Sequence, residues 1–308
     1  MHAPLPARWR RALAVTLFVL LTSFASHAFE AHEARAYAKR SDSLTGSTTP
    51  LSIRWLAPIE GSEVSGTLSG SSCQVATPDS IALTKVSFYL DGSLLSTDTT
   101  RPYSCHIDTA TLAGGTHILK AKAYDASGQV LSAYEFVSTP LTGAPAITVT
   151  VQGDSLTVGS WWRMPADLGA PYELVSVSAH IGRPAIKGLA LLRRQRLGRI
   201  VVFALGTNDW WDTPAEYRND LMQVLKLIGP SRCLVLPTVW RAGRAQNALN
   251  SILRSLATRY GPARVQLAPW AQAVADGRVR LHDGTHPASQ AGWQVRAQII
   301  DAAVRACA

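Results

Sequence analysis

The sequence predicts an α/β fold, with a doubly wound, five-stranded parallel sheet over residues 146–308, preceded by a small all-β sandwich over residues 51–138. In the C-terminal half, apolar strand-like runs alternate with helical segments, which is the pattern of a parallel sheet with right-handed crossovers. In the N-terminal half, short runs of alternating polarity are separated by turn signals, which is typical of a β-sandwich. The 308 residues are enough for about two domains.

The first 28 residues predict an export signal. Three arginines (Arg8, Arg10 and Arg11) precede an apolar run from Ala12 to Phe24, and Ser26-His27-Ala28 places small residues where a signal peptidase cleaves. The apolar run is short for a membrane span, so we expect cleavage, with an uncleaved N-terminal anchor as the alternative. Residues 29–50 are polar and without periodicity, which predicts a flexible leader. The mature chain is therefore expected to be exported, to the periplasm or the medium.

The sandwich is predicted from its hairpins. Lys85 to Leu90 and Ser93 to Leu95 are strand-like runs joined by Asp91-Gly92, a pair typical of a tight hairpin turn. The Gly114-Gly115 turn precedes another strand, His117 to Tyr124. We expect His106 and His117 to lie on the strand surface.

A linker is predicted over residues 139–145, and five strand–helix pairs follow it. The expected strands are 146–152, 173–179, 199–205, 233–238 and 263–268. The expected helices begin near 156 and cover 184–196, 214–228, 244–260 and 287–306. Ile200 to Leu205 is apolar throughout, as expected of a strand covered on both faces. Thr213 to Glu216 predicts a capping box with proline at the first helical position.

Four short motifs follow predicted strands. They are Gly153-Asp154-Ser155, Gly182, Gly206-Thr207-Asn208-Asp209 and Asp283-Gly284-Thr285-His286. Ligands of open α/β sheets bind at the carboxyl ends of the strands, so we expect the four motifs to meet at one edge. Together they predict a catalytic site.

These motifs resemble those of the SGNH/GDSL hydrolase family, and the resemblance covers residues 146–306. It implies that Ser155 in GDSLTVG is the nucleophile and that Asp283 and His286 in DGTHP are the acid and base. It also implies an oxyanion hole formed by Ser155, Gly182 and Asn208. The block around Gly182 reads His-Ile-Gly-Arg-Pro instead of the Asn-x-Gly form of common esterases, and this variant looks more like SGNH domains that add or remove acetyl groups on cell-envelope polysaccharides.

Each proposed role has a chemical reason. A serine hydroxyl is a poor nucleophile until an imidazole takes its proton, and an acid fixes the tautomer of that imidazole. Backbone N–H groups and an amide can stabilise the oxygen that becomes negative in the tetrahedral intermediate. Glycine at 182 is expected because a side chain would obstruct the approach of the backbone. His282 is the alternative base, Asp154 is expected to pack behind the nucleophile turn, and Asp209 to brace the Asn208 loop.

Tryptophans are frequent near the expected edge of the sheet. Five of the nine follow strand ends or motifs: Trp161, Trp162, Trp210, Trp211 and Trp240. They predict an aromatic platform for sugar rings or an acyl group, with helix–sheet packing as the alternative. Arg183 is a further candidate for contact with an anionic substrate, and a solvent-facing arginine is the alternative.

The four cysteines of an exported chain can form two disulfides. We expect Cys73 to pair with Cys105 and Cys233 with Cys307, because each pair lies within one half of the chain. The absence from the sequence of a CxxC motif, or of a Cys/His cluster at metal-ligand spacing, predicts no structural metal, and we expect no cofactor.

The net charge is +9, and residues 145–308 supply 19 basic and 10 acidic residues. The excess indicates either a soluble arginine-rich surface or attraction to an anionic polymer. Nucleic acid is not an expected partner of an exported chain without a recognisable binding motif.

Residues 51–138 resemble the Ig-like modules of bacterial surface proteins and secreted enzymes, on the run from FYLDG to DASG. Such modules are usually spacers or weak binders. Together with the predicted export signal, the resemblance to SGNH hydrolases implies an exported serine esterase that removes small acyl groups, acetyl in particular, from carbohydrate or cell-envelope polysaccharide. The alternatives are an O-acetyltransferase that uses the same groups, and a polymer-binding protein with an inactive hydrolase domain.

Overall fold

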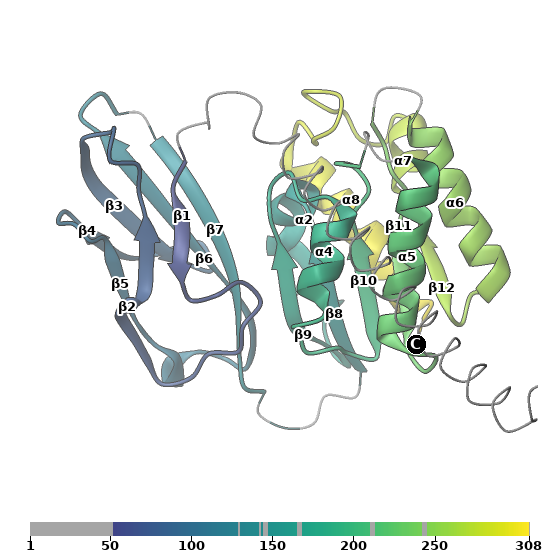
Figure 1. The fold of residues 1–308 in the computed structure, drawn as a ribbon, viewed down its shortest axis with the longest axis horizontal. Coiled ribbons are helices and arrows are strands. Elements are labelled where there is room, and N and C mark those ends of the chain that lie inside the picture. The colour runs from purple at the N-terminus through teal and green to yellow at the C-terminus, as the bar shows by residue number, and fades with distance from the viewer. Residues whose placement is uncertain are drawn as a thin grey trace, which may run out of the picture. The chain divides into compact units, whose positions relative to one another are not determined.

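The computed structural model describes residues 52–128, 130–141, 143, 147–164, 168–209, 213–241 and 245–307. Within these ranges an all-β part comes first, and strands and helices alternate after it (Figure 1). The predicted export signal and leader lie outside the described residues.

The N-terminal part consists of two antiparallel sheets, with strand orders β1-β2-β5 and β4-β3-β6-β7. The strands are β1 (Arg54–Ala57), β2 (Thr67–Ala76), β3 (Leu83–Leu90), β4 (Ser93–Asp98), β5 (Ser104–Asp108), β6 (Gly115–Asp125) and β7 (Val130–Thr139), and the short helix η1 (Thr109–Thr111) follows β5. Asp91 and Gly92 join β3 to β4 with positive φ angles of 50° and 87°, as a tight hairpin turn requires. The predicted all-β sandwich is confirmed.

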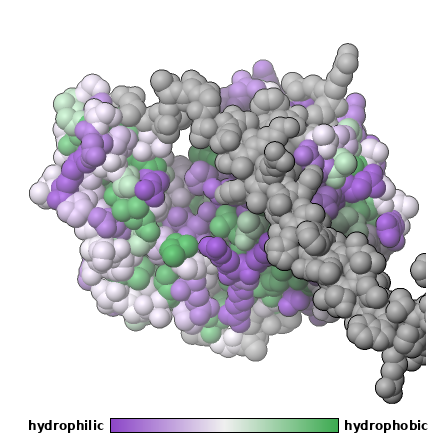
Figure 2. All heavy atoms as spheres, in the orientation of Figure 1, coloured by the Kyte–Doolittle hydropathy of each residue, from purple (hydrophilic) through white to green (hydrophobic). Residues whose placement is uncertain are grey.

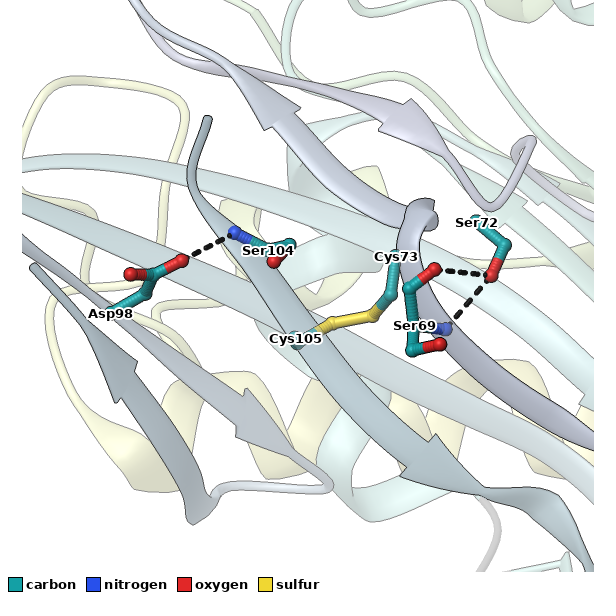
Figure 3. The surroundings of a disulfide bond; sticks show 6 residues. All are labelled: Ser69, Ser72, Cys73, Asp98, Ser104 and Cys105. Atoms are coloured by element: carbon teal, nitrogen blue, oxygen red, sulfur yellow. Dashed lines mark hydrogen bonds between the residues drawn. A yellow bond between two sulfur atoms is a disulfide. The ribbon is translucent and has the colours of Figure 1, made fainter. Parts of the chain in front are cut away.

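The sandwich closes over an apolar core that a disulfide crosses. Alternate residues of β3 and β6, such as Val86, Phe88 and Leu119, are buried there, and Cys73 of β2 is bonded to Cys105 of β5. Figure 3 shows this disulfide beside the bond from the Ser104 N–H to Asp98. The first predicted pairing is therefore present.

The C-terminal part is a five-stranded sheet in which all neighbouring strands are parallel, with the order β12-β11-β10-β8-β9. Its strands are β8 (Ile147–Gly153), β9 (Tyr172–Ala179), β10 (Ile200–Ala204), β11 (Cys233–Pro237) and β12 (Val265–Ala268). The chain leaves β8 toward β9 on one side, and β10 lies on the other side, so the topological switch point is at β8 and β10. The predicted doubly wound sheet is confirmed.

Helices cover both faces of this sheet (Figure 1). The helices are α2 (Ser155–Ser160), η2 (Trp161–Arg163), α4 (Ala185–Leu192), α5 (Pro214–Ile228), α6 (Ala245–Tyr260), α7 (Trp270–Ala275) and α8 (Gln290–Arg305). Val201 and Phe203 of β10 pack in one apolar cluster with α4, α5 and α6. Val202 of the same strand packs in a second cluster with η2, α7 and α8. This alternation explains why β10 is apolar at every position.

Two helices differ from the prediction. Helix α4 ends at Leu192, and the Gln195 amide group then turns inward and donates to Ser176 Oγ at 3.0 Å. The helical periodicity of a sequence does not show that a residue such as Gln195 contacts a distant strand. Helix α7 was not predicted, because its six residues are too few to show a period.

The part of the chain from Leu51 onward forms one unit, in which β7 of the sandwich contacts β9 of the parallel sheet. Cys233 at the start of β11 is bonded to Cys307 after α8, which is the second predicted disulfide. In Figure 2 hydrophobic residues form small patches separated by hydrophilic ones. Among the described helices there is none with the length and apolarity to span a membrane.

Candidate active site

Ser155 is the first residue of helix α2, directly after strand β8. Asp154 caps this helix, because its carboxylate accepts the Leu156 N–H at 3.0 Å. The turn is tight: a Cβ on Gly153 would lie 2.0 Å from Thr157 Oγ1. The strand–turn–helix geometry places the serine at the carboxyl end of a central strand.

His286 and Asp283 meet Ser155 from the loop before α8. Ser155 Oγ lies 2.8 Å from His286 Nε2, and His286 Nδ1 lies 2.7 Å from Asp283 Oδ2. The other carboxylate oxygen of Asp283 accepts the backbone N–H groups of Thr285 and His286 at 2.9 and 2.7 Å. Gly284 has a φ of +79°, which lets the loop fold back around this carboxylate.

The environment of Asp283 favours the ionised form of its carboxyl group. Partial burial works against ionisation, but the hydrogen bonds from His286 and Thr285 hold the pKa of Asp283 well below its usual range. A carboxylate beside Nδ1 keeps the proton on that nitrogen, so Nε2 can accept the proton of Ser155. The three side chains can therefore activate a serine hydroxyl.

Asn208 lies in the turn after β10, beside the nucleophile turn. Its amide nitrogen lies 3.3 Å from Asp154 Oδ2 and 3.3 Å from the Arg183 carbonyl oxygen. Gly206 opens this turn, and a Cβ there would lie 2.6 Å from Val239. Asp209 accepts the Ala185 N–H at 2.8 Å, so it holds the Asn208 loop to the start of α4, in line with its predicted bracing role.

Gly182 lies in the turn between β9 and α4, with a φ of +77°. A Cβ built at this position meets nothing within 4 Å. A side chain at this position would therefore meet no neighbouring residue of the protein itself. Glycine is favoured because the left-handed backbone conformation strains other residues.

A buried arginine that the sequence did not indicate, Arg296, acts electrostatically on Asp154 behind the nucleophile turn. Asp154 and Arg296 are 0% and 2% exposed, and the Arg296 guanidinium is the main charge that opposes the effect of burial on Asp154. Burial raises the pKa of Asp154 and lowers that of Arg296 to about 10. Arg296 also lies over the Trp270 ring at 5.0 Å. No motif marks Arg296, because its role depends on how α8 packs on the sheet.

Arg183 does not face solvent or a substrate, so both interpretations of it were wrong. The residue is 3% exposed, its guanidinium donates to Ser178 Oγ at 2.9 Å, and it forms a salt bridge with Glu60 of the sandwich. Ser178 Oγ in turn donates to Glu60 at 2.9 Å. Arg183 therefore ties the loop after β9 to the sandwich.

The tryptophans are not a common platform in the described part of the chain. Trp161 is 4% exposed and meets Phe136 of the sandwich edge-on, at 5.1 Å between ring centroids, so most of its ring is used in packing. Trp240 is half-buried and packs against the core. Trp210 and Trp211 lie outside the described residues, as does the side chain of Trp162.

His282 is exposed and does not take the place of His286. Its ring nitrogens lie 3.2 Å from the His286 carbonyl oxygen and 3.5 Å from Asp283 Oδ2. Among the described residues, His282, Asp283 and His286 could offer ligand atoms to a metal ion. Both ring nitrogens of His286 already contact Ser155 and Asp283, and this arrangement fits acid–base chemistry.

Comparison with known proteins found separate matches for the two halves of the chain. Residues 52–121 match the sequence profile of the family described as bacterial Ig domain. The fibronectin(III)-like modules of Clostridium thermocellum CbhA are 24% identical, cover 30% of this chain and 99% of their own, with a TM-score of 0.26. No curated protein matches the chain.

Two solved structures cover about half of the chain. The C-terminal catalytic domain of peptidoglycan O-acetyltransferase A from Streptococcus pneumoniae, with a methylsulfonyl adduct, is 17% identical over 54% of this chain and 93% of that one, with a TM-score of 0.42. A member of the lipolytic protein G-D-S-L family from Veillonella parvula is 12% identical, with a TM-score of 0.40. The match covers 49% of this chain and 94% of the Veillonella chain. The chain thus combines a region that matches bacterial Ig domains with a half whose structural neighbours include G-D-S-L proteins.

Proposed function

We propose that this protein is an exported serine esterase that removes small acyl groups, acetyl in particular, from a carbohydrate or cell-envelope polysaccharide. The observation that carries the proposal is the aligned chain of contacts from Ser155 Oγ to His286 Nε2, at 2.8 Å, and from His286 Nδ1 to Asp283 Oδ2, at 2.7 Å. The two disulfides support an oxidising compartment.

In the proposed mechanism His286 takes the proton of Ser155 as its oxygen attacks the ester carbonyl. The Asn208 amide and the backbone N–H groups of Ser155 and Gly182 would stabilise the oxygen that becomes negative. His286 then gives its proton to the departing alcohol, and an acyl-serine remains. Water, activated by the same imidazole, releases the acid and restores the serine.

The test is hydrolysis of p-nitrophenyl acetate by the protein without residues 1–28. Replacing Ser155 with alanine should lower turnover by at least about 10³-fold, because the nucleophile is lost, while thermal unfolding stays nearly unchanged. A fluorophosphonate probe should label the unmodified protein at Ser155, which peptide mass spectrometry would locate. Turnover that survives in Ser155→Ala would reject this residue as the nucleophile.

A matched pair of histidine variants tests the base. His286→Ala should lose activity nearly as completely as Ser155→Ala. His282→Ala should retain most of it, since His282 is exposed and His286 is the histidine that contacts the serine. Absence of both turnover and probe labelling in the unmodified protein would favour the polymer-binding alternative.

A further inference from the structure

One face of the sandwich carries alternating lysine and tyrosine side chains. In the sheet β4-β3-β6-β7, residues two apart along a strand share a face, and so do residues paired across strands. By this rule one side of β3, β6 and β7 carries six such residues, which we name the Lys/Tyr face: Lys85, Tyr89, Lys120, Lys122, Tyr124 and Tyr134. The opposite side of these strands contains the buried core residues Val86, Phe88 and Leu119.

Each lysine of the Lys/Tyr face lies over a tyrosine ring. The distances from Nζ to the ring centroid are 5.0 Å for Lys85 and Tyr124, 5.1 Å for Lys120 and Tyr134, and 5.4 Å for Lys122 and Tyr89. Such contacts hold the rings and the charges in fixed positions. Lys85 is exposed and the other five residues are half-buried, so their edges and charged ends reach solvent.

The Lys/Tyr face is positively charged. The other described residues that share this side of β3, β6 and β7 are uncharged: Ser87, Thr116, Ile118, Val130, Ser132, Phe136 and Ser138. Three positive charges on the strands therefore have no acidic partner among these neighbours. A surface of this kind attracts a negatively charged chain.

The Lys/Tyr face opens into a cleft beside the parallel sheet. The cleft has a volume of about 1040 Å³, and Lys120, Tyr134 and Asp91 line it from the sandwich. Glu173 of β9 is a second acidic residue in its lining, so the excess of positive charge lies on the part of the Lys/Tyr face outside the cleft. Val158, Gly159 and Trp293 line it from the other side. Pockets for drug-sized ligands have about 300–1,000 Å³, so this cleft has room for more than one sugar ring.

The far wall of the cleft adjoins the catalytic residues. Val158 and Gly159 are three and four positions after Ser155 in α2, so they share its side of the helix. Trp293 packs directly on Gly159, where an added Cβ would lie 2.4 Å from the indole ring. The centroid of the Trp293 ring is 6.3 Å from that of His286.

We propose that the Lys/Tyr face and the cleft form one extended binding surface for an acidic carbohydrate chain. The chain lies across the sandwich and presents its acylated sugar to Ser155. Tyrosine edges and rings contact the apolar faces of the sugars, and the lysines pair with carboxylates of the chain. This inference rests on the proposed function and assigns its substrate class.

The kinetic test compares three acetyl esters: p-nitrophenyl acetate, an acetylated acidic polymer (acetylated polygalacturonate) and an acetylated neutral polymer (acetylated glucomannan). Lys120→Gln with Lys122→Gln should raise KM for the acidic polymer at least tenfold and leave the other two substrates within about twofold, because only the acidic chain loses charge pairs. Tyr134→Ala should raise KM for both polymers. Lys226→Gln, an exposed lysine on α5, is the matched control and should change nothing.

A binding test removes catalysis from the comparison. The Ser155→Ala variant should bind de-acetylated polygalacturonate, and added salt should weaken this binding. Adding Lys120→Gln and Lys122→Gln to this variant should weaken the binding at least tenfold. Thermal unfolding of each variant checks that the sandwich remains folded.

The outcomes separate the inference from the proposed function. No hydrolysis of p-nitrophenyl acetate by the unmodified protein would reject the esterase. Normal hydrolysis together with unchanged KM and unchanged polymer binding in the lysine variants would overturn the binding surface. Equal losses on the acidic and the neutral polymer would overturn the acidic substrate class.

Discussion

At the scale of single residues, the chemistry of the site depends on which ring nitrogen of His286 carries the proton. The carboxylate of Asp283 receives two backbone N–H groups on one oxygen and the His286 ring on the other. Because these bonds hold the pKa of Asp283 well below its usual range, the carboxylate is lost only in strong acid, as the pH falls through that lowered value. A loss of activity in mild acid must therefore come from another group.

Asn208 gives a prediction for the oxyanion hole. Its amide nitrogen lies between Asp154 and the Arg183 carbonyl, close to the serine turn. Asn208→Ala should lower kcat by about 10²–10³-fold with little change in KM, because the amide acts on the charge that develops in the transition state. Steady-state kinetics on p-nitrophenyl acetate would measure this. A rise in KM alone would contradict the oxyanion role.

At the scale of elements, short turns position the chemistry. Asp154 caps α2 and so fixes where the serine helix begins. The loop before α8 closes through the bond from His282 N–H to the His286 carbonyl at 3.0 Å, close to the imidazole proposed as the base. These elements are local, and their residue types were visible in the sequence.

A buried histidine of β6, His117, contacts the hairpin between β3 and β4, contrary to the surface position expected for it. His117 is 7% exposed; Nδ1 lies 2.7 Å from Asp91 Oδ2, and Nε2 lies 2.9 Å from the Ala113 carbonyl oxygen. Both partners are acceptors, which favours the doubly protonated ring. The hydrogen bond to Asp91 raises the pKa of His117 above 6.5, although burial opposes it.

The stability of the sandwich should therefore depend on pH. A raised folded-state pKa adds stability that is complete below the unfolded value and is lost as the pH rises through the folded value. The unfolding temperature should fall as the pH rises above the unfolded value of about 6.5, and His117→Gln should flatten this dependence. His106→Gln, an exposed position on β5, is the control. An unchanged slope in His117→Gln would refute the assignment.

At the scale of the whole molecule, a buried salt bridge joins the sandwich to the loop after β9, which carries Arg183. Arg183 binds Glu60 through its side chain and lies 3.3 Å from the Asn208 amide through its carbonyl oxygen. Glu135 lies nearby, and burial, together with the charge of Glu60, raises its pKa to about 9. A protonated Glu135 leaves Glu60 as the negative partner of Arg183. The sandwich thus contributes to the position of the proposed oxyanion hole.

Glu60→Gln should disturb both stability and catalysis. Breaking a buried ion pair costs about 3–5 kcal/mol, because the remaining charge stays buried, and kcat should fall more than KM rises. Glu63→Gln is the matched control, since Glu63 and Arg196 form an exposed pair at 3.6 Å, worth at most about 1 kcal/mol. Unfolding curves and steady-state kinetics of both variants test this. A Glu60 variant as mild as the Glu63 variant would contradict the link.

The sequence alone determined the two kinds of sheet, the alternation of strands and helices in the C-terminal half, both disulfide pairings and the positions of the four motifs. These features follow from local periodicity, turn residues and the rule that parallel strands end at one edge. The identity of the residues behind the site was decided only by the tertiary structure. Glu60 and Arg183 are 123 positions apart, and their contact depends on how the sandwich packs on β9. Arg296, Trp161 and His117 were buried for the same reason: long-range packing sets their environment, and a local pattern does not carry that information.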